Sequence, residues 1–362
     1  MLQKNDGITL RQMLLIGFVS AFTPIIRTMP AHTLQIAGNA AWLAPIIATP
    51  VLFLLVWLMF AFFKKSGGGE HFYDIICKAT GNVAGKIICS IFVLWLMYYH
   101  SFMLRKSSEQ HLSSVYEEGN LVVLILIVAI ITMIGAYGKI KSLARSAGII
   151  SIIVTATLII SLGFAFANVN TENLLPISTK DAIPVLRASV PVIEIISPFV
   201  YLSFIGGYVE GKMKKKTVYI CLIMVMLLVT MLMVTTIGAL GAPMTERVQN
   251  PFFVMVRDVK IFNVLKRIEA AVVAVGVAVE FIFLSISLVV ISQIITFITG
   301  TGERKKFVIP LAVITAIGAL IISPNAFLLS YTHENIINMV NPLLIFILTP
   351  VIFIIGKMRR KI

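Results

Sequence analysis

Residues 189–209 read SVPVIEIISPFVYLSFIGGYV, and this stretch decides the fold. It is long and apolar enough to cross about 30 Å of hydrocarbon, yet it contains Pro191, Pro198 and the pair Gly206-Gly207. A proline inside a helix removes a backbone donor and clashes with the preceding turn. In lipid, the carbonyl that loses its donor must find a partner in protein, water or a ligand. An interrupted membrane helix of this kind indicates a transporter-like binding site.

Nine other long apolar runs accompany this one, so the sequence predicts ten membrane spans. The chain of 362 residues is 59% apolar and 13% charged, and its mean hydropathy is +0.99. Soluble domains are about 45–50% apolar and about 25% charged, so the composition excludes a water-soluble globular protein, a disordered chain and a secreted disulfide scaffold. The runs lie at about 12–36, 41–63, 84–104, 120–138, 146–167, 189–209, 217–240, 269–298, 307–323 and 338–356.

The basic residues orient these spans. With the N-terminus inside, 20 of the 30 lysines and arginines fall in the inside segments and nine in the outside segments, while Arg27 lies within a span. This bias predicts that both termini are cytoplasmic. The net charge of +14 therefore follows from membrane topology, and we expect the bilayer, not a nucleic acid, as the partner of the basic surface. The apolar residues of the outside segment 241–268 suggest a helix lying in the membrane interface.

Ten spans divide into two groups of five, at 9–167 and 188–356, within one integral membrane domain covering 1–362. Because five is odd, the second group enters the membrane from the opposite side. The first span contains Pro24, Arg27 and Pro30, so interruptions fall in the first helix of each group. We therefore predict an all-α polytopic membrane protein of about ten transmembrane helices in two inverted five-helix repeats, with helices one and six broken. Ordinary proline kinks are the alternative.

Three stretches carry a resemblance that runs over essentially the whole length. They are Thr9-Leu10-Arg11-Gln12 with Pro30 and the turn Ala37–Leu43; Glu194-Ile195-Ile196-Ser197-Pro198-Phe199; and Asn250-Pro251-Phe252 with Lys266-Arg267-Ile268-Glu269-Ala270. Their order and spacing resemble the endospore germination permeases, the B subunits of nutrient germinant receptors. These permeases are part of the amino acid–polyamine–organocation transporter superfamily, whose fold is LeuT-like. The family commonly has glycine at the first break, where this chain has Ala21-Phe22-Thr23-Pro24.

The resemblance implies a receptor subunit of the spore inner membrane. Such a subunit binds a small nutrient, often an amino acid, and signals with A-type and C-type partner subunits. A working secondary transporter for amino acids or related organic cations is the alternative. We expect no enzyme, because the spans show no cluster of His, Asp or Cys near one membrane face. We also expect no metal or cofactor, since the three cysteines form no CxxC pair and the five histidines form no HxxxH or HxH pair.

The two interrupted helices supply the first group of expected substrate-binding residues. Free amides at the start of a half-helix suit a carboxylate, and free carbonyls at an end suit an ammonium group. The expected residues are Ala21, Phe22, Thr23 and Pro24 in the first span and Ser197, Pro198, Phe199 and Tyr201 in the sixth. Plain packing is the alternative for the aromatic members.

Charged residues supply the second group. Arg27 lies well inside a span, where an unpartnered charge costs about 2.5–3.5 kcal/mol, so we expect it to pair with Glu194 or Glu280. Glu280 lies about 16 Å along its helix from Glu269, which predicts a position near the midplane. Arg27 or Glu280 would meet the charged end of a zwitterionic ligand, and the alternative is a structural ion pair. We expect Glu194, Arg267 and Glu269 to act in gating or structure.

Tyr98 in the third span and Ser285 in the eighth complete the expected binding residues, because these spans flank the site in the resembling fold. A tyrosine near a membrane interface can instead belong to an aromatic belt, and a serine can bond back to its own helix.

Overall fold

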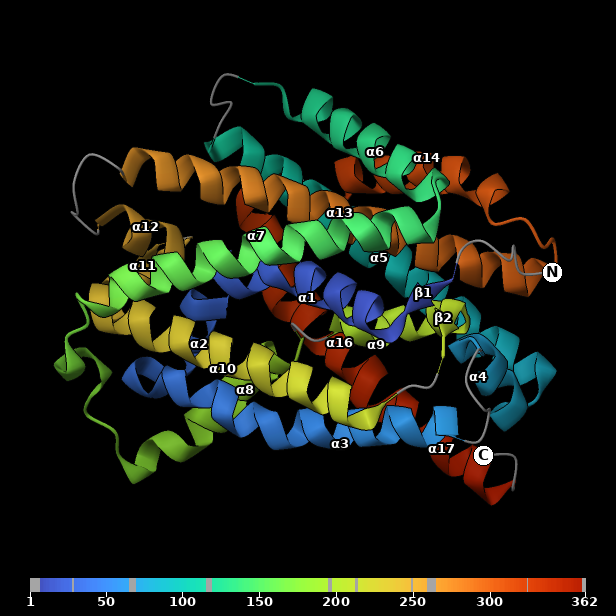
Figure 1. Cartoon of the computed structure of the whole chain (residues 1–362), viewed down its shortest axis with the longest axis horizontal. Coiled ribbons are helices and arrows are strands. Elements are labelled where there is room, and N and C mark those ends of the chain that lie inside the picture. The colour runs from blue at the N-terminus through green and yellow to red at the C-terminus, as the bar shows by residue number, and fades with distance from the viewer. Residues whose placement is uncertain are drawn as a thin grey trace.

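The computed structural model describes residues 7–27, 29–64, 70–114, 119–194, 197–211, 214–248, 250–258, 265–323 and 325–359. They are mostly helical, and the long helices run roughly side by side in one elongated bundle (Figure 1). The predicted all-α polytopic membrane fold is confirmed. The division into 9–167 and 188–356 stays a prediction.

The helical elements occupy all ten of the predicted apolar runs. The long helices are α1 (Leu10–Arg27), α3 (Ala44–Lys64), α5 (Asn82–Ser114), α6 (Leu121–Tyr137), α7 (Ile140–Phe166), α8 (Ala182–Glu194), α10 (Lys215–Leu240), α13 (Leu265–Thr299) and α14 (Lys305–Ile321). The short helices are α2 (Met29–Ala37), α4 (Phe72–Thr80), α9 (Ser197–Tyr201), α11 (Ala242–Arg247), α12 (Pro251–Asp258), α15 (Ala326–Thr332), α16 (Asn338–Leu343) and α17 (Thr349–Met358). Within the described ranges, seven helical stretches are long and apolar enough to cross a membrane, and Leu10–Ile26 and Leu121–Tyr137 are shorter apolar helices.

The described parts of the first predicted span are α1, which contains Pro24, and α2. After α2 the chain turns at Gly38, whose φ of 55° lies in the left-handed region that favours glycine. The short 3-10 helix η1 (Gly38–Leu43) then leads into α3. The predicted turn between the first two spans therefore rests on a glycine in a conformation that other residues adopt at a cost.

The described parts of the sixth predicted span are α8, α9 and the 3-10 helix η4 (Leu202–Tyr208), and the span ends in β2 (Val209–Glu210). This strand pairs in parallel with β1 (Ile8–Thr9), so that Ile8 lies opposite Val209. The start of the first span and the end of the sixth are thereby joined by backbone hydrogen bonds.

The elements β1, β2, α4 and α17 lie at one end of the bundle, and α11 and α12 lie at the other (Figure 1). We call the first of these the basic end, because exposed Arg11 and Lys214–Lys216 lie at the starts of α1 and α10 there. The described start and finish of the chain, β1 and α17, share this end. In the segment 241–268, Phe252 and Met255 of α12 are buried in the main core. This segment therefore packs into the bundle through α12, where the sequence suggested a helix lying in the interface.

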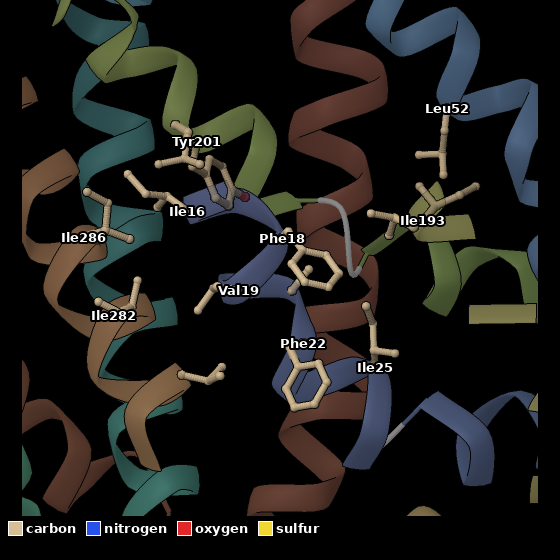
Figure 2. Close-up of a cluster of buried hydrophobic side chains, with 14 of the residues drawn as sticks. Ile16, Phe18, Val19, Phe22, Ile25, Leu52, Ile193, Tyr201, Ile282 and Ile286 are labelled. Carbon is tan, nitrogen blue, oxygen red and sulfur yellow. The ribbon is translucent and has the colours of Figure 1, made fainter. Parts of the chain in front are cut away.

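The long helix α13 organises the centre, because it packs against α1, α5, α6 and α7. Its successive side chains face different neighbours. Ile282 and Ile286 point toward Val19 of α1 (Figure 2), whereas Phe283 lies against the ring of Tyr99 in α5. Phe281 approaches Gly135 of α6.

Candidate functional site

The predicted break in the sixth span is centred on its second proline. The described helix α8 ends at Glu194, and α9 begins at Ser197, next to Pro198. Pro198 has no backbone N–H, so it cannot give the Glu194 carbonyl the usual helical hydrogen bond from four residues ahead. Glu194 therefore combines a carboxylate with a backbone carbonyl that lacks its regular helical donor.

Four side chains from distant helices hydrogen-bond around that carboxylate. The Asn341 amide donates to Glu194 Oε1 at 3.0 Å, and Asn341 Oδ1 accepts from the Tyr201 hydroxyl at 2.6 Å and from Trp95 Nε1 at 2.7 Å. The Tyr99 hydroxyl makes a further side-chain hydrogen bond to Glu194. We call Trp95, Tyr99, Glu194, Tyr201 and Asn341 the polar cluster. It connects α5, α8, α9 and α16.

Glu194 is 3% exposed and Asn341 is fully buried. A buried carboxylate is costly unless it is hydrogen-bonded and paired with a cation. Glu194 makes no ion pair with any side chain that the structure describes. The cationic side chain whose field reaches it is Lys106 of α5. Glu194 is therefore a buried acceptor able to take an ammonium group.

Asn341 lies in a distorted helix. It is flanked by two π-helical segments, η5 (His333–Ile337) and η6 (Leu344–Leu348), and is followed by Pro342. Widened turns of this kind occur frequently at functional sites. Here they place the Asn341 side chain among Trp95, Tyr201 and Glu194.

The first span contributes a second set of free polar groups. Pro24 leaves the Ser20 carbonyl without its helical donor, and the buried Ser20 and Thr23 hydroxyls have no hydrogen-bond partner among the described residues. Ala21 and Phe22 beside them are buried. Of the four residues expected at the first break, Ala21 and Phe22 therefore lie in the core, and Thr23 and Pro24 are half-buried beside them.

Apolar side chains separate these two sets of polar groups. Phe18, Phe22 and Ile25 follow one another along α1, and Tyr201 of α9 lies beside Ile16 (Figure 2). The Tyr99 and Tyr201 rings are 6.4 Å apart between centroids. The region between α1 and α9 thus combines aromatic surface with polar groups at its edges.

Three of the expected binding residues make packing contacts among the described residues. Tyr98 stacks on Trp95 at 5.6 Å and packs with Leu329 and Ile337, while its neighbour Tyr99 is the member of the polar cluster. The Phe199 ring packs directly on Gly17 of α1, since a Cβ added to Gly17 would lie 2.5 Å from that ring.

Ser285, the third of these residues, is fully buried. It approaches Gly135 of α6, and its hydroxyl has no partner among the described residues.

Glu280 forms a separate cluster with α5. Glu280 Oε2 lies 2.9 Å from His111 Nε2, and the Ser107 hydroxyl donates to the same oxygen. All three side chains are buried. Lys86 of α5 bonds to the Ile298 carbonyl near the basic end, and Glu280 lies about 27 Å farther along α13. The expected position of Glu280 near the membrane midplane stays a prediction.

The side chains of Arg27, Ser197, Arg267 and Glu269 lie outside the described residues. The expected pairing of Arg27 with a glutamate, and the gating or structural roles of Arg267 and Glu269, stay predictions. Of the two candidate partners of Arg27, Glu280 is already held by Ser107 and His111.

A third cluster closes the basic end, and we call it the inner latch: His71, Tyr73, Tyr208 and Gln293. His71 Nδ1 lies 2.8 Å from the Phe204 carbonyl, and the His71 ring stacks on Tyr73 at 4.8 Å. Gln293 accepts from the Tyr208 hydroxyl and donates to that of Tyr73, each at 3.1 Å. The latch joins α4, η4 and α13 beside the β1–β2 pair.

Several residues of these clusters were not identified from the sequence. Asn341 and Trp95 are missing from the expected site, as are His111 and Ser107. An amide directly before a proline within an apolar run is a signal that could have indicated Asn341. No spacing within the sequence relates His111 to Glu280, because 169 residues separate them along the chain.

Comparison with known proteins gives the fold and the family. A Na+-coupled sialic acid symporter, solved in a substrate-bound outward-open state, aligns with 95% of this chain and 78% of its own, at a TM-score of 0.60 and 13% identity. The structure of MhsT in complex with L-phenylalanine aligns with 98% of this chain and 99% of its own, at a TM-score of 0.62 and 14% identity. These similarities show a LeuT-like transporter fold.

No curated protein matches the sequence. A family model described as spore germination protein matches residues 8–327, which is most of the chain. The chain therefore belongs to the spore germination protein family of multi-pass membrane proteins.

Proposed function

We propose that this protein is the nutrient-binding B subunit of a spore germinant receptor, and that it binds an amino-acid-like germinant between α1 and the break in the sixth span. The observation that carries the proposal is the buried Glu194 carboxylate, which has no cationic partner among the described side chains. In this reading the ammonium group of the nutrient binds Glu194. Its carboxylate binds near Thr23, Pro24 and Arg27, and its side chain lies against Phe22.

The polar cluster suits this role because its donors and acceptors already orient the carboxylate. Asn341 and Tyr99 bond to Glu194 and leave further lone pairs on its oxygens free. Tyr201 and Pro198 lie beyond the break, so a ligand held by Glu194 would bias the position of α9. A change in α9 would reach the basic end through η4 and the inner latch.

The receptor reading includes A-type and C-type partner subunits and the spore inner membrane, with the basic end facing the cytoplasm. The test is a germinant screen of spores from a strain that lacks this chain and its neighbouring subunits. Complementation with all subunits should restore the response to one nutrient class. Spores complemented with the Glu194→Gln chain should need at least tenfold more of that nutrient to germinate to the same extent.

A second function, secondary transport of amino acids or related organic cations, is favoured by the Glu280–His111 pair. A buried carboxylate that shares its oxygen with an imidazole can exchange a proton when the pair separates. The purified chain in liposomes, supplied with a labelled amino acid and a pH gradient, separates the two functions. Robust concentrative uptake that is lost in Glu280→Gln would support transport, whereas binding without uptake would support the receptor role.

A further inference from the structure

A cavity of about 120 Å³ lies among α1, α3, α9, η4 and α10, away from the polar cluster. Its walls are apolar apart from the Ser203 hydroxyl and the Cys221 thiol, and include Met13, Met59, Phe60, Phe199, Cys221 and Val225. An apolar cavity of similar size, about 150 Å³, is large enough to admit benzene. The cavity can therefore hold a short stretch of hydrocarbon.

The cavity lies beside the outer surface of the bundle. Trp57 of α3 and Met224 of α10 are 50% and 60% exposed, respectively, on the two helices that wall it. In a membrane protein such surfaces face acyl chains. Along α10 the wall runs from Val218 to Val225, which is about 10 Å of helix.

Positive charge is concentrated where the cavity meets the basic end. Lys214, Lys215 and Lys216 are exposed at the start of α10, and Lys215 Nζ lies 5.9 Å from the centre of the Phe60 ring, which is part of the wall. The start of this 26-residue helix adds partial positive charge at the same place. Glu210 carries a carboxylate a few residues before these lysines, and its side chain lies against Gly7.

This cavity and the polar cluster use opposite faces of α9. Phe199 lines the cavity and Tyr201 joins the cluster, and two residues along a helix are separated by about 200°. A molecule in the cavity would therefore touch the broken sixth span without entering the proposed nutrient site.

We propose that the cavity binds one acyl chain of an anionic phospholipid whose phosphate is held by Lys214, Lys215 and Lys216. Burying an acyl chain in protein instead of lipid gives little net driving force, so selectivity comes from the headgroup. Each lysine near an anionic lipid surface contributes about 1 kcal/mol, which corresponds to a factor of about five. The bound lipid would fix the distance between α9 and α10 and so tie the state of the sixth span to the lipid composition.

The test uses the purified chain in nanodiscs of phosphatidylcholine containing a minor fraction of phosphatidylglycerol. Retained lipid is counted by native mass spectrometry, and a phosphatidylglycerol with a photoactivatable acyl chain is mapped by peptide sequencing. We expect phosphatidylglycerol to be retained preferentially and to crosslink to α3 and α10 near Phe60 and Cys221. Replacing the three lysines by alanine should lower that preference at least tenfold.

The matched control is Lys305→Ala with Lys306→Ala, because Lys305 also lies over an aromatic ring, that of Tyr137, at 4.9 Å, and neither Lys305 nor Tyr137 lines this cavity. This variant should retain the preference of the wild type. Equal retention of the two lipids by the wild type, or equal losses in the two lysine variants, would overturn the proposal.

A second measurement separates the acyl chain from the headgroup. With Cys77 and Cys89 replaced by alanine, Cys221 is the one thiol left in the sequence, and phosphatidylglycerol should slow its labelling by a membrane-permeant maleimide relative to phosphatidylcholine. Val225→Trp should fill the cavity and abolish the acyl crosslink, with folding checked by the unfolding temperature. Labelling of Cys221 that is independent of lipid would show that no acyl chain occupies the cavity.

Discussion

Asn341 and Glu194 are 147 residues apart in the chain and meet through a hydrogen bond of 3.0 Å in the core of the bundle. Asn341 belongs to the π-distorted tenth predicted span, and Glu194 ends α8 in the sixth predicted span. Their contact connects the span that contains Pro198 with a helix that is widened on both sides of the contact. A ligand that competes for Glu194 would therefore act on two spans at once.

Replacing Glu194 by glutamine tests whether its charge binds the nutrient. Glutamine keeps a hydrogen bond to Asn341 but loses the charge, and hydrogen bonds to charged groups contribute about 1.5–3 kcal/mol. We expect the nutrient concentration for half-maximal germination to rise at least tenfold at unchanged protein level. Glu303→Gln is the control, because Glu303 pairs with Lys306 in an exposed position. An unchanged dose-response for Glu194→Gln would remove Glu194 from the site.

Asn341→Leu tests the polar cluster as a structural unit. The change removes the shared partner of Glu194, Tyr201 and Trp95. Glu194 keeps its bond from Tyr99, and Trp95 keeps its bond to the Tyr201 hydroxyl at 3.2 Å, so the Tyr201 hydroxyl loses its acceptor; a buried group left unsatisfied costs about 1–3 kcal/mol. We expect a clearly lower unfolding temperature in detergent. Asn338→Leu, in the same helix, removes only the contact with His32 and should cost less. Equal shifts for the two variants would contradict this account.

Pro198→Ala tests the break in the sixth span. Alanine restores the N–H that the Glu194 carbonyl lacks, so a continuous helix becomes more favourable there. We expect a blunted germination response from a chain that folds and accumulates normally. Pro310→Ala is the control, since Pro310 lies within the regular helix α14. A wild-type dose-response in Pro198→Ala would argue against a role for the break.

The architecture could be predicted because its causes are local. Apolar runs of membrane length, lysines at one end and prolines at matching places are each visible within about 25 residues. The polar cluster could not be predicted in full, because Trp95, Glu194 and Asn341 come together only through helix packing. Tyr98 and Tyr99 show the same limit, since adjacent residues on a helix differ by about 100° in direction. Only the packing of α5 decides which of the two faces Tyr201.

Reversing the charge of Arg27 tests whether it pairs with a glutamate. An acidic residue at this position places an uncompensated negative charge inside the membrane, so we expect Arg27→Glu to lower the amount of folded protein there. Glu194→Arg should not restore it, because in the proposed site Glu194 binds the ammonium group of the nutrient and Arg27 binds its carboxylate. Glu280→Arg should not restore it either, because Glu280 is held by His111 and Ser107. Rescue by either substitution would identify that glutamate as the structural partner of Arg27 and contradict the proposed site.

His71 makes the inner latch sensitive to pH. It lies outside the candidate membrane spans, and burial lowers the pKa of His71 below its ordinary 6.5, although the hydrogen bond to the Phe204 carbonyl and the charge of Asp74 act in the opposite direction. A histidine with a lowered pKa in the folded state stabilises that state above pH 6.5, and the contribution is lost as the pH falls below 6.5. We expect faster hydrogen exchange of the β1–β2 pair at pH 5 than at pH 7, after correction for the intrinsic exchange rate.

The other titratable groups facing the latch are Asp74, Tyr73 and Tyr208. Burial raises the pKa of Asp74, so its own effect has the opposite sign, because protonation relieves the cost of its buried charge. His71→Phe keeps an aromatic ring against Tyr73 and Tyr208 and should abolish the acceleration at pH 5, whereas Asp74→Asn should leave an acceleration at least as large as in the wild type. If His71→Phe exchanges as fast as the wild type at pH 5, the pH dependence comes from another group.

The His71 ring packs directly against Gly207, because a Cβ added to this glycine would lie 2.5 Å from the ring. Gly207→Ala should therefore push the ring away, open the inner latch, and speed hydrogen exchange of the β1–β2 pair at both pH values.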